Sequence, residues 1–478
     1  GVNARLFAVP FTKIAEELGT SLMKNMVATG ASAALLGLPV EVIAKVVEEE
    51  FGRKGPVVVE KNVEAVSRGA KYVMDIAGGP LEEFRLEPAD GKGRLFMIGN
   101  DAIGLGAIAA GCRLMAAYPI TPASEIMEYL IKRLPKFGGT VVQTEDEIAA
   151  VTMAIGANYG GVRAMTASAG PGLSLMMEGI GLAGMTETPV VIVDTQRGGP
   201  STGLPTKQEQ SDLNAMIYGT HGEIPKVVLA PSTIEECFYD TIEAFNIAEK
   251  YQCPVILLTD LQLSLGKQTA ELLEYDRIRI ERGNVVTEAP PLEEDKLFER
   301  YKITESGISP RVFPGTKHGI HHVTGVEHDQ EGRPSEHAGN RKQMMDKRLR
   351  KLKQLQVTNP IKVNAPHEAP DVLFIGMGST GGTIDEARGR LEKEGLKTNH
   401  VTVRLIHPFP AEQLLPHLQK AKTVLVVENN ATAQLANQIK LHCGHADKIR
   451  NVLKYDGNPF LPSDVYRACK EHIMLVRS

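Results

Sequence analysis

The chain has 478 residues, a formal net charge of −5 and a charged fraction of 23%, values typical of ordinary globular proteins. A general nucleic-acid binder is normally basic, so the negative charge argues against that class. The sequence has no apolar run of about 18 residues or more, so no membrane span and no membrane partner are expected. A chain of this length predicts two to four domains.

The cysteines indicate the compartment and exclude one kind of cofactor site. Five cysteines stand apart from one another, and no CxxC pair occurs. An iron–sulfur cluster needs about four thiolates at close spacing, so any such cluster is expected on a partner chain. Reduced thiols in a cytoplasmic protein are the simplest interpretation, and the first residues lack the order of a secretory signal peptide. We expect no metal ligands in this chain.

The first predicted elements are helices, at Thr12–Leu18 and Val40–Phe51. Helices without a full set of strands are typical of the second half of an α/β domain, which we place at 1–87. A polar segment with Gly and Pro, at 79–92, separates it from the next part of the chain.

Short apolar runs alternate with helical patterns between 88 and 265. The predicted strands are Arg94–Ile98, Met115–Tyr118, Thr140–Thr144, Arg163–Ser168, Pro189–Asp194, Lys226–Leu229 and Pro254–Asp260. Strands that are apolar on both faces and alternate with helices predict a parallel sheet covered on two sides. The fold class is therefore α/β.

The rest of the chain divides into a linker and a second domain. Residues 266–365 are polar, with scattered Gly and Pro, and predict an extended linker. Basic residues crowd Arg341–Lys353, a predicted helix that is either a solvated face or a docking surface for an acidic partner. Within 366–478 a smaller α/β domain is predicted, with strands at Asp371–Gly376, Asn399–Arg404 and Thr423–Glu428.

The loop Tyr118-Pro119-Ile120-Thr121-Pro122 lies between a predicted strand and a predicted helix. In an open parallel sheet, ligands bind where loops leave the carboxyl ends of the strands. The two prolines stiffen the loop, so the Thr121 hydroxyl is expected at a rigid position. A plain helix entry with two prolines explains the same residues.

Three carboxylates, Glu145, Asp146 and Glu147, precede the predicted helix Ile148–Asn158. Acidic residues stabilise helix N-termini, which is a sufficient structural explanation. The functional interpretation has one glutamate turned inward, where it can hydrogen-bond a heterocycle nitrogen and move a proton.

Two further loops are expected at the same end of the sheet. Ser168-Ala169-Gly170-Pro171-Gly172 has little side-chain bulk and lets a flat ligand approach the backbone. The loop Gln196–Lys207 carries Arg197, whose guanidinium can bind a carboxylate with two nitrogens. A surface loop with an exposed arginine is the alternative.

Together these loops resemble one known family. The stretches are AYPITPASE (117–125), TEDEIAAV (144–151), TASAGPGLSLMMEGIG (166–181) and DTQRGGPSTGLPTK (194–207). In order and spacing they are similar to the alpha subunit of 2-oxoacid:ferredoxin oxidoreductases, most of all the 2-oxoglutarate type. The resemblance implies a pyrimidine-type thiamine-diphosphate-binding domain at 88–265, a transketolase C-terminal-like domain at 366–478 and the C-terminal half of a gamma-type domain at 1–87.

The resemblance also implies the residues that contact thiamine diphosphate. Glu147 would be the catalytic residue, hydrogen-bonded to the aminopyrimidine ring and favouring its imino tautomer. Glu145 is the alternative for this role. Pro119 and Ile120 would line the ring.

Substrate contacts are implied at four positions. Thr121, Arg197 and Thr206 would bind the carboxylate and carbonyl of the oxoacid, and Lys207 would bind a second, distal carboxylate. The implied reaction is the reversible oxidative decarboxylation of 2-oxoglutarate to succinyl-CoA with reduction of ferredoxin. Pyruvate, branched-chain oxoacids and indolepyruvate remain alternative substrates.

The partners follow from the same resemblance. The GDG…N motif for Mg²⁺ and diphosphate is not found in this sequence. Mg²⁺ and a [4Fe-4S] cluster are therefore implied on a beta subunit, in an (alpha-beta)₂ heterotetramer that uses coenzyme A as co-substrate. Two other classes compete with this one: a thiamine enzyme without iron–sulfur chemistry, and a non-catalytic scaffold or regulatory subunit.

Overall fold

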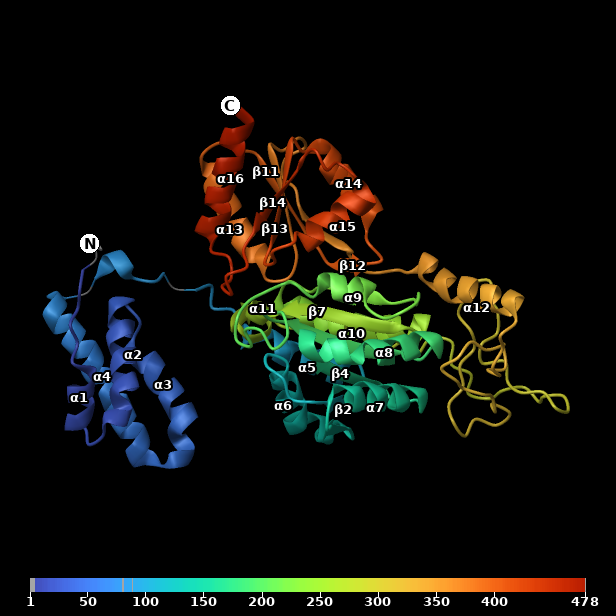
Figure 1. Ribbon diagram of the computed structural model, residues 1–478. Helices are drawn as coiled ribbons and strands as arrows, with labels where there is room; N and C mark the ends of the chain where they lie inside the picture. The colour runs from blue at the N-terminus through green and yellow to red at the C-terminus, as the bar shows by residue number, and fades with distance from the viewer. Residues whose placement is uncertain (1–4, 80, 88, 478) are drawn as a thin grey trace. The chain divides into compact units, whose positions relative to one another are not determined.

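The computed structural model describes residues 5–79, 81–87 and 89–477, with the side chains of 474–477 excepted. The chain forms two compact units, 1–93 and 94–478 (Figure 1). No helix in the described residues is both long and apolar enough to cross a membrane.

The smaller unit has helices and no strand among its described residues. Its helices are α1 (Phe11–Glu17), α2 (Lys24–Leu35), α3 (Val40–Phe51) and α4 (Pro56–Ala77). Helices α2 and α4 pack closely because each has a glycine at the contact. A Cβ on Gly30 would meet the backbone of Val66, and one on Gly69 would meet the backbone of Val27. The long helix α4 was not predicted from the sequence, although α1 and α3 were.

The larger unit is built on a central sheet of seven strands, in the order β12-β6-β7-β5-β4-β2-β3. The strands are β2 (Leu114–Ala117), β3 (Thr140–Gln143), β4 (Ala164–Ser168), β5 (Val190–Gln196), β6 (Val227–Leu229), β7 (Pro254–Asp260) and β12 (Leu405–His407). All pairs are parallel except β12 with β6. This confirms the predicted parallel sheet, with one strand added at its edge from the C-terminal part of the chain. The prediction was wrong for Arg94–Ile98, because Leu95–Met97 pairs antiparallel with Gln268–Ala270 in a separate sheet of two strands.

Helices cover both faces of the central sheet (Figure 1). One apolar core packs the first face against α5 (Gly99–Ala109), α6 (Ser124–Arg133), α10 (Ile234–Tyr251) and α11 (Leu261–Leu265). A second core packs the other face against α7 (Glu147–Tyr159), α8 (Gly170–Met185) and α9 (Leu213–Tyr218). Because both faces are buried, the strands read as continuous apolar runs in the sequence.

A second sheet of five strands follows, in the order β14-β13-β10-β11-β9. Its strands are β9 (Ile361–Asn364), β10 (Val372–Gly376), β11 (Thr398–Val403), β13 (Thr423–Glu428) and β14 (Ile449–Leu453). The helices around it are α13 (Thr380–Lys393), α14 (Ala411–Lys420), α15 (Gln434–Cys443) and α16 (Pro462–Arg477). In Figure 1, α13 and α16 lie on one side of this sheet and α14 and α15 on the other.

Gln210 joins the two sheets through its side chain. Its amide nitrogen donates to Asp260 Oδ2 at 2.7 Å and to the Met377 carbonyl at 3.1 Å. Its amide oxygen accepts from the Asn429 backbone N–H at 3.1 Å. The segment that follows the Gly-rich loop of β5 is therefore fixed between the two domains.

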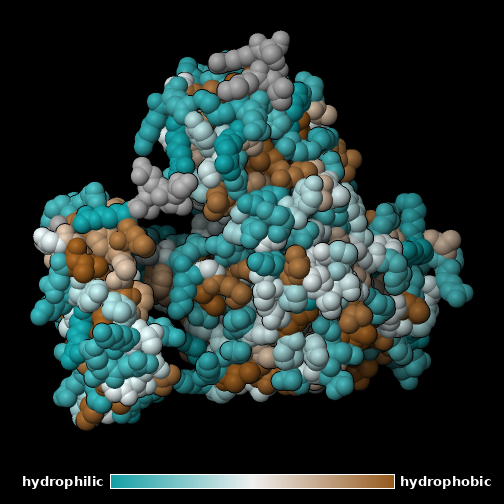
Figure 2. Space-filling model, turned by 60° about the vertical axis from the view of Figure 1, so that its left-hand side comes forward, coloured by the Kyte–Doolittle hydropathy of each residue, from teal (hydrophilic) through white to brown (hydrophobic). Residues whose placement is uncertain are grey.

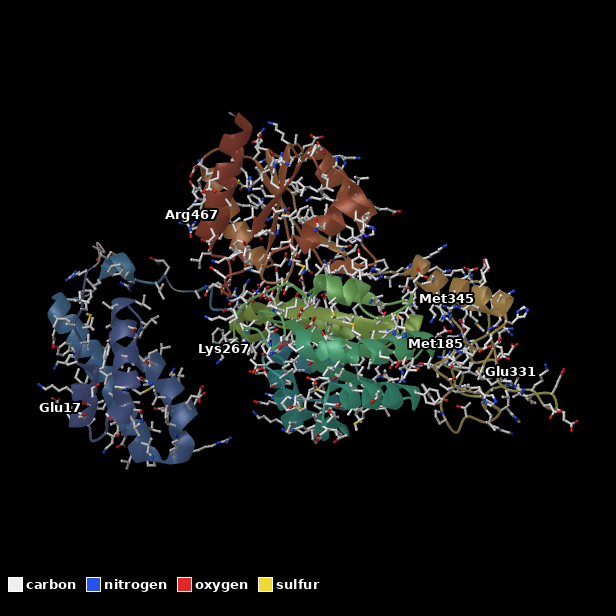
Figure 3. All side chains as sticks on the ribbon, in the orientation of Figure 1. Glu17, Met185, Lys267, Glu331, Met345 and Arg467 are labelled. Atoms are coloured by element: carbon white, nitrogen blue, oxygen red, sulfur yellow. The ribbon has the colours of Figure 1, made fainter. Side chains whose placement is uncertain are left out.

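The segment after the central domain includes a short β8 (Gln268–Ala270), paired with β1 (Leu95–Met97), and α12 (Ala338–Arg350). In Figure 3, Met345 on α12 and Met185 at the end of α8 lie on the same side of the central domain. This side carries the amino ends of the strands, because α8 ends just before β5 begins.

Both interpretations of the basic run are wrong for its central residues. Lys347 and Lys351 are fully buried, and their amines lie 2.6 Å from the two carboxylate oxygens of Glu187. Arg348 is also buried and pairs with Glu327 at 2.6 Å. The basic residues therefore hold α12 against the amino edge of the sheet, a tertiary role that the charge pattern alone did not reveal.

Candidate active site

Loops from four neighbouring strands meet at the carboxyl edge of the central sheet. The order β3-β2-β4-β5 places the ends of these strands side by side. The Thr144 backbone N–H, just after β3, donates to the Ala117 carbonyl at the end of β2, at 3.0 Å. The loops expected to form a site therefore do lie at one edge.

The three acidic residues after β3 have different surroundings. Asp146 is the N-cap of α7, and its Oδ1 accepts from the Ala149 N–H at 2.7 Å. Glu145 is exposed, whereas Glu147 is only 7% exposed. The Glu147 carboxylate accepts no hydrogen bond from any described residue. Asp146 thus fulfils the structural role of helix capping, and Glu147 is the inward acid of the three, without a partner in the described part of the chain.

The start of α8 lies directly beside Glu147. An added Cβ on Gly172 would touch Ser168 Oγ and would lie 2.7 Å from Cγ and 2.8 Å from Oε1 of Glu147. Only a residue without a side chain leaves this space to the glutamate. The small-residue turn predicted after β4 therefore serves to seat Glu147.

Arg197 joins two of the loops. Its guanidinium donates to the Thr121 carbonyl at 2.7 Å and to the Thr202 carbonyl at 3.1 Å. It is buried, and its Nε has no hydrogen-bond partner among the described residues. Burial lowers the pKa of Arg197, and the nearby Asp212 carboxyl opposes that effect. The structure thus brings Thr121 and Arg197 together, through the backbone of Thr121.

A buried asparagine, which the sequence did not suggest, also holds the Thr121 loop. Asn100, in the first turn of α5, donates from Nδ2 to the Pro122 carbonyl at 2.6 Å. Pro119 is exposed in this loop, and Ile120 is half-buried against the first core. Their apolar surface therefore lies next to the carboxyl edge.

Thr206 and Lys207 lie on the exposed part of the loop after β5. This loop closes on itself, because the Leu204 N–H donates to the Gly198 carbonyl at 2.8 Å and the Gly198 N–H donates to the Lys207 carbonyl at 3.1 Å. The structure does not place the Thr206 and Lys207 side chains in a buried group with Arg197. Both face solvent at the rim.

Comparisons with known proteins identify the family. The profile described as "Pyruvate flavodoxin/ferredoxin oxidoreductase, thiamine diP-bdg" matches residues 105–347. Subunit alpha of 2-oxoacid:ferredoxin oxidoreductase 1 from Sulfurisphaera tokodaii is 38% identical, over 98% of this chain and 75% of its own length. The chain belongs to the 2-oxoacid:ferredoxin oxidoreductase alpha subunits. The recognition made from the loop motifs is therefore confirmed.

Other matches cover the remaining parts of this alpha subunit. The profile "Pyruvate ferredoxin/flavodoxin oxidoreductase" matches residues 2–72, and "Pyruvate:ferredoxin oxidoreductase core domain II" matches 370–465. The KorA subunit of 2-oxoglutarate synthase from Methanocaldococcus jannaschii is 38% identical, over 78% of this chain and 98% of its own. A 2-oxoglutarate:ferredoxin oxidoreductase from Magnetococcus marinus, solved with 2-oxoglutarate, coenzyme A and succinyl-CoA bound, matches with a TM-score of 0.90 and 38% identity. That match covers 98% of this chain and 80% of the solved one.

The alpha subunit also has an acidic group that sequence reasoning missed. Asp194 is fully buried on β5, and burial, together with Asp212, raises its pKa. Burial raises the pKa of Asp212 to about 6, with Glu209 adding to the effect and Arg197 opposing it. The available signal was an aspartate at the end of the otherwise apolar run PVVIVD. The guanidinium of Arg197 lies near Asp212.

Proposed function

We propose that this alpha subunit takes part in the oxidative decarboxylation of 2-oxoglutarate to succinyl-CoA, with electrons passed to ferredoxin. The Methanocaldococcus relative is named as a 2-oxoglutarate synthase subunit, and the Magnetococcus structure holds 2-oxoglutarate and coenzyme A. The observation that carries the proposal is Glu147, an inward carboxyl at the carboxyl edge of the sheet that has no hydrogen-bond partner among the residues the structure describes.

The residues present fit the aminopyrimidine ring of thiamine diphosphate. Glu147 offers a shielded carboxyl that would hold a ring nitrogen and exchange a proton with it. Pro119 and Ile120 offer apolar surface to the ring, and Gly172 leaves the space that the carboxyl occupies. When bound, thiamine diphosphate supplies the nucleophilic carbon and the electron sink for decarboxylation.

Arg197 and Thr121 would bind the reacting end of the oxoacid. An arginine fork suits a carboxylate because two N–H groups can donate in parallel. Arg197 Nε is buried without a partner among the described side chains and backbone groups, so one donor of the guanidinium is left unused. Thr206 would assist at the same end, and the exposed amine of Lys207 would attract a distal carboxylate. A second carboxylate distinguishes 2-oxoglutarate from pyruvate.

We assign the diphosphate, Mg²⁺ and the [4Fe-4S] cluster to a beta subunit in an (alpha-beta)₂ assembly in the cytoplasm. Large apolar side chains next to the proposed site are exposed, among them Tyr118, Ile148 and Leu175. Brown apolar patches interrupt the polar surface of the larger unit in the view of Figure 2. Exposed apolar surface of this kind supports a partner chain near Glu147.

The proposed domain spans follow the same assignment. The gamma-type part covers 1–87, the pyrimidine-type domain 88–265, the linker 266–365 and the transketolase C-terminal-like domain 366–478. The first core lies largely within the pyrimidine-type span, whereas the second core is shared between that span and the C-terminal domain.

Glu147→Gln tests the function in the assembled complex. We expect it to lower 2-oxoacid-dependent reduction of ferredoxin by about 10²-fold or more, since an amide cannot exchange the proton. Glu145→Gln is the matched control, because Glu145 is exposed in the same loop, and we expect it to keep near-normal turnover. Near-normal turnover of Glu147→Gln would exclude the assignment and favour a scaffold role.

A further inference from the structure

Ser168 and Asp194 lie side by side behind Glu147. They are register partners on the parallel strands β4 and β5. Two residues earlier, Thr166 pairs with Ile192, which packs in the second core. Side chains alternate along a strand, so Ser168 and Asp194 project to that same face, which α7 and α8 cover (Figure 1).

The polar atoms of this pair have no hydrogen-bond partner in the described part of the chain. Ser168 and Asp194 are both fully buried, and Ser168 Oγ and both carboxylate oxygens of Asp194 are unpartnered. Oδ2 of Asp212 is buried and unpartnered as well. Leaving such atoms without partners is unfavourable, and converging buried polar atoms are the usual binding site of ordered water.

Two glycines of α8 connect these atoms to the proposed active site. Ser168 Oγ and Glu147 Oε1 face the same small space over Gly172, where an added Cβ would meet both. At Gly170 an added Cβ would lie 2.7 Å from Oδ2 and 2.8 Å from Oδ1 of Asp212. The polar atoms therefore follow the first turn of α8 from Glu147 to Asp212.

We propose that Ser168, Asp194 and Asp212 enclose ordered water and share a proton, and that they form a polar path between Glu147 and Arg197. Its catalytic role rests on the proposed function. A proton that leaves Asp194 passes through water to Ser168, which gives its own proton to Glu147. The serine hydroxyl is regenerated, Asp194 gains a negative charge and Glu147 loses one. The three residues are positioning residues.

The charged groups around the path favour a proton that stays on the buried carboxyls. Asp212 is near enough to Asp194 to raise its pKa, and both carboxyls have raised pKa values chiefly because they are buried. Glu209 adds negative charge near Asp212, and Arg197 is the nearby cation. Asp260, on the neighbouring strand β7, is not part of the path. Its oxygens accept from Leu263, Gln210 and Ser379.

Infrared spectroscopy of the assembled complex tests the shared proton directly. At pH 7 we expect the difference spectrum of wild type minus Asp194→Asn to contain the C=O band of a protonated carboxyl. A spectrum without this band would overturn the proposal, whatever the activity of the enzyme.

The pH dependence of stability gives a second readout. The pKa of Asp212 is about 4 in the unfolded chain and about 6 in the folded chain. The folded state therefore loses stability as pH rises through this range, because Asp212 must ionise while it is buried. Asp212→Asn should therefore raise the unfolding temperature at pH 8 and leave it unchanged at pH 4. An equal difference at both pH values would contradict the shared proton.

Ser168→Ala tests the link to Glu147. We expect it to keep the infrared band, to lower turnover by about tenfold or more and to shift the pH profile of kcat. Thr166→Val is the matched control, because Thr166 is a buried hydroxyl on the same face of β4. Unchanged turnover and pH profile in Ser168→Ala would remove Ser168 from the path. The two proposals can fail separately. Full turnover of Glu147→Gln would contradict the proposed function, and the infrared band would still show whether Asp194 holds a proton.

Discussion

Replacing Gly172 by alanine perturbs Glu147 without changing any charged group. The added methyl carbon would lie 2.7 Å from Glu147 Cγ and 2.8 Å from its Oε1, whereas ordinary contact begins at 3.4 Å. The glutamate side chain must therefore move by about 0.6 to 0.7 Å, and Ser168 Oγ must also turn away. A catalytic group is held to within about 0.5 Å of its productive position, so this displacement is large enough to matter.

The expected cost has two parts. Overpacking of a close-packed interior destabilises the fold by about 1–3 kcal/mol. Misplacement of a catalytic group by about 1 Å costs about 10²-fold in rate, so we expect Gly172→Ala to lose between about tenfold and 10²-fold in turnover. The assay is the initial rate of 2-oxoacid-dependent ferredoxin reduction by the purified complex, with thermal unfolding measured on the same samples.

Gly389→Ala is the control for glycine replacement in a helix. Gly389 is exposed in α13, and an added Cβ there would meet no atom within 4 Å. This variant should keep full turnover and gain up to about 1 kcal/mol of stability from better helix propensity. If Gly172→Ala assembled normally and turned over within about twofold of wild type, Glu147 would not need the position that the structure gives it.

Three further changes test other parts of the molecule. Arg197→Lys should raise KM for the oxoacid by about tenfold or more, because the lysine amine cannot bind a carboxylate with two parallel N–H groups. Loss of thiamine diphosphate with unchanged KM would show that Arg197 is misassigned. Lys207→Met should raise KM for 2-oxoglutarate more than KM for pyruvate, and equal effects in steady-state assays of both acids would exclude a contact with the distal carboxylate. Glu187→Gln should destabilise the folded chain by about 3–5 kcal/mol in denaturant unfolding, because it leaves buried Lys347 and Lys351 unpaired. The control is Glu386→Gln, which breaks the exposed pair of Glu386 with Arg390 and should lower the free energy of unfolding by only about 0.5 kcal/mol. An equally small effect of Glu187→Gln would contradict the buried cluster.

The central sheet could be predicted because each of its strands is marked by a short apolar run of consecutive residues. Residues such as Val190–Gln196 and Pro254–Asp260 are buried on both faces, so their apolar runs stand out against the helices between them. The loops of the site could be placed for the same reason, since parallel strands put their carboxyl ends at one edge.

Contacts between distant residues could not be predicted in this way. The strand Leu405–His407 completes the central sheet from 176 positions after its partner Leu229, as the pairing of Leu405 with Leu229 shows. Lys347 reads as a surface residue in a basic run, and only the fold brings it to Glu187, 160 positions earlier. The role of Gly172 likewise depends on a neighbour from another helix.

Buried carboxyl groups have pKa values shifted in opposite directions at the two edges of the central sheet. At the amino edge Glu187 lies between two lysines, and Glu249 contacts Arg311, Arg282 and Arg163. Cations therefore outnumber the acids there, and the Glu187 carboxyl has a lowered pKa, chiefly because Lys347 and Lys351 outweigh its burial.

At the carboxyl edge the guanidinium of Arg197 lies near Asp212, and burial raises the pKa values of both Asp212 and its neighbour Asp194. Ionised carboxyls at this edge would repel the carboxylate of an oxoacid and would neutralise the positive charge of Arg197. A neutral Asp194 removes one of these negative charges, and Asp212 becomes neutral as pH falls below about 6. Burial that keeps Asp194 protonated therefore helps this acid-rich edge to bind an anion, and the charge-compensated opposite edge stabilises the fold that maintains this burial.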